Sequence, residues 1–148
     1  MERTSQLGIA LAVLGGVIAF MGLFPGVIGL DQAQGVGLFQ MTVILLGFCL
    51  LILGAATFVQ LNYYAGRKHT LGQEIALRLS MTGLIISIVS GYADILGIGS
   101  HPPFGEQRPL LGSVQVVGLV GGFVIASVGI ILFALLGQSD HDEPNQTT

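Results

Sequence analysis

The chain alternates long apolar stretches with short polar connections. Four stretches reach or exceed the roughly 20 residues that a helix needs to cross a bilayer. They are Leu7 to Leu30, Val36 to Leu61, Ile75 to Gly99 and Leu110 to Gly137. Together they leave almost nothing for a globular domain, so the pattern predicts an all-α fold, an integral membrane four-helix bundle.

The two halves of the chain resemble each other. Shifting the sequence by 75 residues aligns Arg3 to Leu61 with Arg78 to Leu136 without a gap, and thirteen aligned pairs are identical. Composition alone gives roughly five, and six of the identical pairs are glycines and two are glutamines. Because each copy crosses the membrane an even number of times, both copies have the same orientation. The repeat therefore predicts a tetraspan protein made of two tandem, same-orientation helical hairpins.

The repeat also divides the chain. We place the first transmembrane hairpin at residues 1–66 and the second at residues 67–137. Residues 138–148 are polar and acidic, which is typical of a disordered tail. Its acidic side chains and His141 are interpreted as solvated rather than as metal ligands.

The basic residues predict the orientation. Four lie near the N-terminus and the central connection, and the two hairpin loops hold one: Arg3, Arg67, Lys68 and Arg78 against Arg108. By the positive-inside rule, both termini are cytoplasmic and both hairpin loops face outward, in a multi-pass protein of the cell membrane. Tyr63 and Tyr64 then belong to the aromatic belt at the inner membrane surface.

Small residues recur at every seventh position. They are Gly8, Gly15 and Gly22 in the first stretch, Gly83, Ser90 and Gly97 in the third, and the pairs Gly47 with Gly54 and Gly122 with Gly129 in the other two. A period of seven keeps residues on one face of a left-handed bundle. Since helices in lipid associate through close packing at small residues, this glycine-rich face is expected to be the interior.

Three polar residues extend this face. Gln40 and Gln115 each lie seven residues before one of its glycines, and Asp94 lies four residues after Ser90. Asp94 follows Arg78 by 16 residues, about 24 Å of helix, which places it in the outer third of the bilayer. Asp94, Gln40 and Gln115 are therefore expected to converge at one level.

This cluster has two interpretations. A carboxylate flanked by two amides within a membrane segment is typical of a site for a cation, a proton or a small polar ligand. Alternatively, the side chains join helices by hydrogen bonds. The glutamines are duplicated, which favours a structural role for them, whereas Asp94 is aligned with Ala19 and stays open between the two interpretations.

The loop from Gly99 to Leu110 differs most from its counterpart. It carries His101, Glu106 and Arg108 among three prolines, and these side chains are candidate contacts of a stiffened outer lid or docking surface. Alternatively, the prolines only end one helix and begin the next.

Composition excludes several functions. Only 9% of the 148 residues are charged, the net charge is -3 and five residues are basic, so nucleic acid is not expected as a partner. The single Cys49 forms no disulfide or thiolate metal site within the chain. The histidines lie outside the apolar stretches, and no nucleophile has an evident base partner. We therefore expect no enzyme activity, cofactor or metal.

The sequence leaves two functions. The first is a non-enzymatic accessory or assembly subunit of a membrane complex, or a small homo-oligomer, with the lipid bilayer and a membrane protein as partners. The alternative is a small channel, transporter or outward-facing binding protein that uses Asp94 with Gln40 and Gln115.

Overall fold

The computed structural model describes residues 2–29, 38–64, 70–93, 96 and 112–136. These residues form four long helices and a short 3-10 helix: α1 (Glu2–Leu23), η1 (Pro25–Ile28), α2 (Leu38–Tyr63), α3 (Leu71–Tyr92) and α4 (Ser113–Leu136). Each long helix is long and apolar enough to cross a membrane. The fold is helical throughout the described residues, as the apolar stretches predict, and indicates a multi-pass membrane protein.

Two helix boundaries differ from the ends of the apolar stretches. α1 ends at Leu23 because Pro25 disfavours helical geometry at Phe24, whose φ is -124° and ψ 68°. At the other boundary, α3 begins at Leu71, before the apolar stretch that starts at Ile75. The reason is an N-terminal cap formed by the residues just before and within its first turn.

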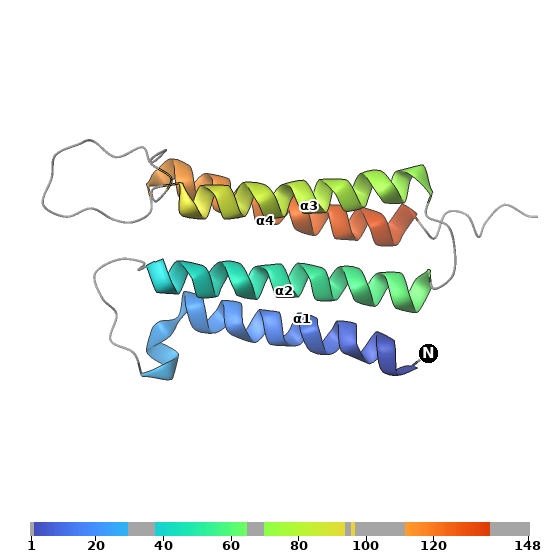
Figure 1. Cartoon of the computed structure of the whole chain (residues 1–148), viewed down its shortest axis with the longest axis horizontal. Helices are drawn as coiled ribbons and strands as arrows, with labels where there is room; N and C mark the ends of the chain where they lie inside the picture. The colour runs from blue at the N-terminus through green and yellow to red at the C-terminus, as the bar shows by residue number, and fades with distance from the viewer. Residues whose placement is uncertain (1, 30–37, 65–69, 94–95, 97–111, 137–148) are drawn as a thin grey trace, which may run out of the picture.

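The four helices lie side by side along the long axis of the molecule (Figure 1). α1 packs along α2 and α3 packs along α4, whereas α2 alone joins these two pairs through sparser contacts with α3 and α4. Within the described residues, α1 touches no other long helix. Tyr63 and Leu71 lie at one end of the molecule and Leu38 and Tyr92 at the other (Figure 1), here called the Tyr63 end and the Leu38 end.

The first helix pair approaches closely at two glycines of α2. A Cβ atom built on Gly47 would lie 2.7 Å from Ala19 Cα, and one built on Gly54 would lie 2.7 Å from Ala12 Cα. Both separations are shorter than any real Cβ contact, so any side chain at either glycine would push α1 away.

The second helix pair repeats this arrangement. A Cβ atom on Gly122 of α4 would lie 2.7 Å from the Ser87 backbone nitrogen, and one on Gly129 would lie 2.6 Å from the Ser80 backbone nitrogen. Backbones of α3 and α4 therefore meet at these glycines, as membrane helices do where small residues allow it.

These contacts correct the expected alignment of α1 with α3, the first helices of the two pairs. Gly47 and Gly122 are 75 residues apart, but their partners Ala19 and Ser87 are 68 apart, so the pairing of Ala19 with Asp94 is wrong by seven residues. The separation along the chain between Ser87 and Gly122 is seven residues longer than the separation between Ala19 and Gly47. A shift of one heptad leaves small residues on the same face, so the sequence pattern is similar in both registers.

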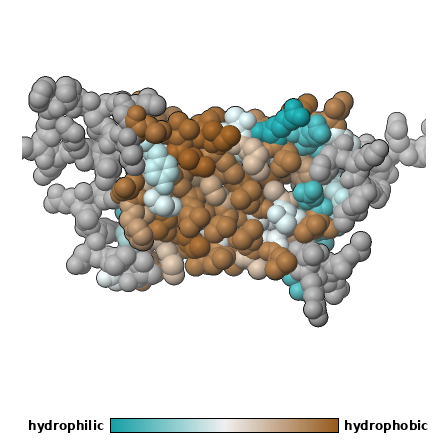
Figure 2. Space-filling view, in the orientation of Figure 1, coloured by the Kyte–Doolittle hydropathy of each residue, from teal (hydrophilic) through white to brown (hydrophobic). Residues whose placement is uncertain are grey.

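The apolar core lies where α2 meets α3 and α4. It is centred on Leu45, Ile52, Leu84, Phe123 and Ala126. A smaller cluster at the Tyr63 end contains Val59, Tyr64, Ala76 and Phe133. Apolar side chains also cover most of the described face in Figure 2, which suits a surface in contact with lipid.

Candidate functional site

Gln40 joins α2 to α1 near the Leu38 end. Its side chain is half-buried, and its Nε2 donates a hydrogen bond of 2.8 Å to the carbonyl oxygen of Gly22. It also lines a small apolar recess of about 200 Å³ with Ile18, Met21 and Val43. The Gln40 amide therefore stabilises the contact between α1 and α2.

Gln115 has a different role at the start of α4. Only 4% of it is exposed, and its Oε1 accepts a hydrogen bond of 2.6 Å from the backbone N–H of Gly112, which precedes the helix. Its Nε2 is buried and has no hydrogen-bond partner among the described residues. Gln115 thus caps its own helix and leaves one buried donor unmatched.

A third glutamine, which the sequence interpretation missed, caps α3. The Thr70 backbone N–H donates to Gln73 Oε1 at 3.0 Å, and the Gln73 backbone N–H donates to Thr70 Oγ1 at 3.3 Å. This is a capping box, and the spacing T-x-x-Q in residues 70–73 is its sequence signature. Gly112 and Gln115 have the same spacing at the start of α4, so this signal could also have indicated the capping role of Gln115.

The described hydrogen bonds do not bring the predicted cluster together. Gln40 binds the backbone of α1, and Gln115 binds the residue before its own helix. Asp94 lies outside the described residues, as do His101, Glu106 and Arg108 of the outer loop.

Buried serines of α3 form a polar feature that the sequence interpretation did not single out. Ser80 and Ser87 are fully buried, seven residues apart, and lie against Gly129 and Gly122. Ser87 Oγ donates to the Leu119 carbonyl oxygen of α4 at 2.9 Å, whereas Ser80 Oγ has no partner in the described part of the chain. The seven-residue spacing from Gln73 through Ser80 to Ser87 is the signal that could have located them.

Two tyrosines join the helix pairs. Tyr64 Oη donates to the carbonyl oxygen of Ala134 at 2.8 Å near the Tyr63 end, and Tyr92 Oη donates to Thr42 Oγ1 at 3.0 Å near the Leu38 end. Tyr63 is 53% exposed, which suits the expected aromatic belt. Tyr64 is only 7% exposed and packs edge-on against an α4 ring, so its expected place in the belt is corrected to an interior contact.

Charge contributes little to the described interior. Arg78 and Glu74, one turn apart on α3, form an ion pair of 3.6 Å in which both side chains are exposed. Such a pair adds little stability because water screens it. Within the described residues, no group of three or more histidine, cysteine, aspartate or glutamate side chains could hold a metal ion.

Comparison with known proteins adds no assignment. No protein-family model, no curated protein and no solved structure matches this chain.

Proposed function

We propose that the chain is a non-enzymatic membrane protein that acts as an accessory or assembly subunit of a membrane complex, or as a small homo-oligomer. One observation carries this proposal: the two glutamines expected in a polar site form hydrogen bonds with the chain's own backbone. Gln40 donates to Gly22, and Gln115 accepts from Gly112. Amides used in this way stabilise helix ends and helix contacts.

The proposed architecture is a pair of tandem hairpins with both termini cytoplasmic. Support comes from the matched glycine contacts of the two helix pairs and from the excess of basic residues near the termini and central connection. α1 packs on α2 alone, which leaves large apolar side chains of α1 uncovered: Leu7, Val13, Val17 and Phe20. Such a face suits contact with lipid and with a further membrane protein.

Purification under mild conditions tests this function. The full chain is extracted in polymer-bounded native membrane discs, cross-linked, and weighed by native mass spectrometry. We expect a mass above that of one chain, made up of specific membrane-protein partners or of additional copies. A monomer that catalyses solute flux after reconstitution into liposomes would contradict the proposal.

The alternative function is a small channel, transporter or outward-facing binding protein using Asp94 with Gln40 and Gln115. The buried Nε2 of Gln115, which has no hydrogen-bond partner among the described residues, favours it, because such a donor needs a partner. In α3 and α4, successive seven-residue steps pair Ser80 with Gly129 and Ser87 with Gly122. One more step would pair Gln115 with position 94, so a partnership of Gln115 with Asp94 remains a prediction.

An asparagine substitution separates the two functions. Under the alternative, Asp94→Asn should abolish ion-dependent flux or ligand binding in liposomes while the helical fold persists, because the amide retains the shape but loses the charge. Under the proposed structural function, D94N should leave the cross-linked assembly unchanged. Circular dichroism of the same preparation verifies that the variant is folded.

A further inference from the structure

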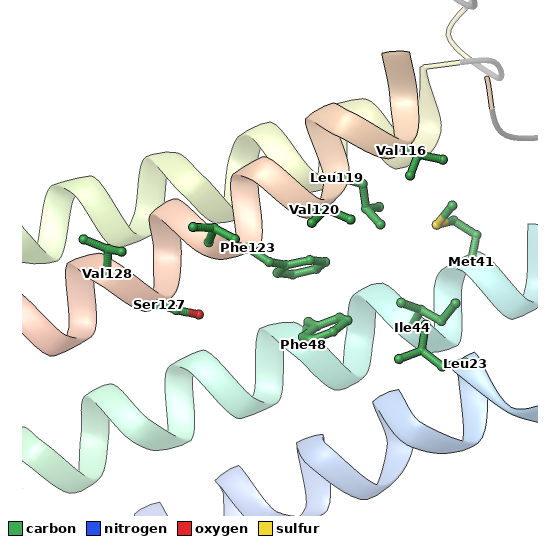
Figure 3. Close-up of a pocket in the computed structure, with 11 residues that line it drawn as sticks. Leu23, Met41, Ile44, Phe48, Val116, Leu119, Val120, Phe123, Ser127 and Val128 are labelled. Atoms are coloured by element: carbon green, nitrogen blue, oxygen red, sulfur yellow. The ribbon is translucent and has the colours of Figure 1, made fainter. Parts of the chain in front are cut away.

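An apolar groove follows α4 where it passes α2 and the end of α1 (Figure 3). Its volume is about 550 Å³, it is open on one side, and Ser127 is the one polar residue in its lining. The remaining lining residues are Leu23, Met41, Ile44, Phe48, Val116, Leu119, Val120, Phe123, Val124 and Val128. An apolar space of this size that stayed empty would deprive its lining of dispersion contacts, so the open groove favours an apolar occupant.

The groove lies at the depth of one bilayer leaflet. Its lining on α4 extends from Val116 to Val128, about 18 Å of helix, against a hydrocarbon thickness of about 30 Å. On α2 it begins at Met41, in the first turn of that helix. The groove therefore extends from near the Leu38 end to somewhat beyond the middle of α4, and most of it lies in the half of the bilayer at that end.

The floor of the groove is aromatic. Phe48 of α2 and Phe123 of α4 face each other, with ring centroids 3.9 Å apart and planes inclined by 31° (Figure 3). No alkyl chain fits between two rings this close together. An occupant is thus confined to the open side, along the valines of α4.

The lining distinguishes between two kinds of occupant. Helices of this chain approach one another where glycine lies against alanine or serine, as Gly47 does against Ala19. The groove has no glycine in its lining and one small residue, Ser127, and the bulky side chains around that serine would hold a partner helix at a distance. A thin, flexible alkyl chain can follow such an irregular apolar surface and fill it.

We propose that the groove binds one acyl chain of a phospholipid from the leaflet at the Leu38 end. The chain lies along Val120 and Val124 and against the Phe123 ring. The site is built by the contact of α2 with α4, so it does not depend on the subunit function proposed above.

Photocross-linking of the full chain tests the site. The protein is reconstituted into phosphatidylcholine vesicles that contain a phosphatidylcholine with a diazirine midway along one acyl chain. Labelled residues are mapped by mass spectrometry after irradiation. Val117, which is 71% exposed but outside the groove, is the internal reference for Val120, which is 52% exposed. We expect several-fold more labelling at Val120 and Val124 than at Val117.

Two matched variants strengthen the experiment. Val120→Trp fills the groove and should reduce groove labelling several-fold, whereas Val117→Trp should leave it unchanged. If Val120→Trp fails to fold, Ser127→Leu narrows the same groove and is assessed in the same way. Labelling that follows exposure alone, with Val117 labelled at least as strongly as Val120, would overturn the proposal. If a photoreactive amino acid placed at position 124 cross-links to protein in place of lipid, that result would overturn the proposal too, because a helix would then occupy the groove.

Discussion

At the scale of single residues, the structure depends on side chains that are small or absent. Gly47 and Gly54 allow α1 to approach α2, and Gly122 and Gly129 allow α3 to approach α4. Dispersion and backbone contact, rather than burial from water, stabilise such helix pairs in lipid. The same reasoning separates glycines that a methyl group would disturb from those it would not.

Gly54→Ala should destabilise the protein. Its new methyl group would lie 2.7 Å from Ala12 Cα, and overpacking of this kind costs about 1–3 kcal/mol. Gly121→Ala is the control, because nothing lies within 4 Å of the place its methyl group would take and alanine favours helix by about 1 kcal/mol. Thermal unfolding in detergent, followed by circular dichroism, should show a lower Tm for G54A and an equal or higher Tm for G121A. Equal losses would contradict the contact assignment.

Gln40→Glu should destabilise the contact between α1 and α2. An ionised carboxylate has no N–H to donate and would place an oxygen against the Gly22 carbonyl oxygen, at a cost of about 1–3 kcal/mol or more. Gln60→Glu, at an exposed position of the same helix, is the control. Unfolding at neutral pH should reveal a loss for Q40E only, and a loss of similar size for Q60E would show that the hydrogen bond is not its source.

At the scale of elements, each helix pair is closely packed and α2 connects the two pairs. Besides the apolar core, the connection includes the tilted ring pair of Phe48 and Phe123 in the middle and one tyrosine hydroxyl bond near each end. Since these contacts are sparse, each should have a measurable effect on how α2 is attached to its neighbours.

Tyr64→Phe should weaken the attachment of α2 to α4. The change removes the hydrogen bond to Ala134 while the ring keeps its contact with Phe133, so we expect a loss of about 0.5–1.5 kcal/mol. Tyr63→Phe is the matched control, since that neighbouring ring is exposed. Chemical unfolding in mixed micelles gives the comparison, and a Y63F loss as large as that of Y64F would argue against the interior role of Tyr64.

At the scale of the whole molecule, the helix directions show which helix termini share one end. α1 and α3 terminate at the Leu38 end of the molecule, and α2 and α4 begin there (Figure 1). Under the orientation proposed from the basic residues of the sequence, this end would lie outside the cell.

Cysteine labelling tests that orientation. In a Cys49→Ala background, single cysteines replacing Gln34 and Ser100 should react with an impermeant thiol reagent added to intact cells, because the basic asymmetry places both hairpin loops outside. A cysteine replacing Thr70, at the start of α3, should react only after the cells are opened. The reverse labelling pattern would mean that the termini are external.

The apolar pattern was sufficient to predict four membrane-length helices, because the length of a bilayer-crossing segment is a local property. It was also sufficient to mark Gly47, Gly54, Gly122 and Gly129 as contact positions, since a seven-residue period marks one face of a helix whatever its partner.

Only the tertiary structure decided how the helices are aligned and which groups meet. Shifting α3 by one heptad leaves its small residues on the same face, so the sequence could not distinguish Ser87 from Asp94 as the counterpart of Ala19. The partner of Gln40 and the burial of Tyr64 likewise depend on residues distant along the chain. Such pairings follow from the packing of whole helices, which no local pattern specifies.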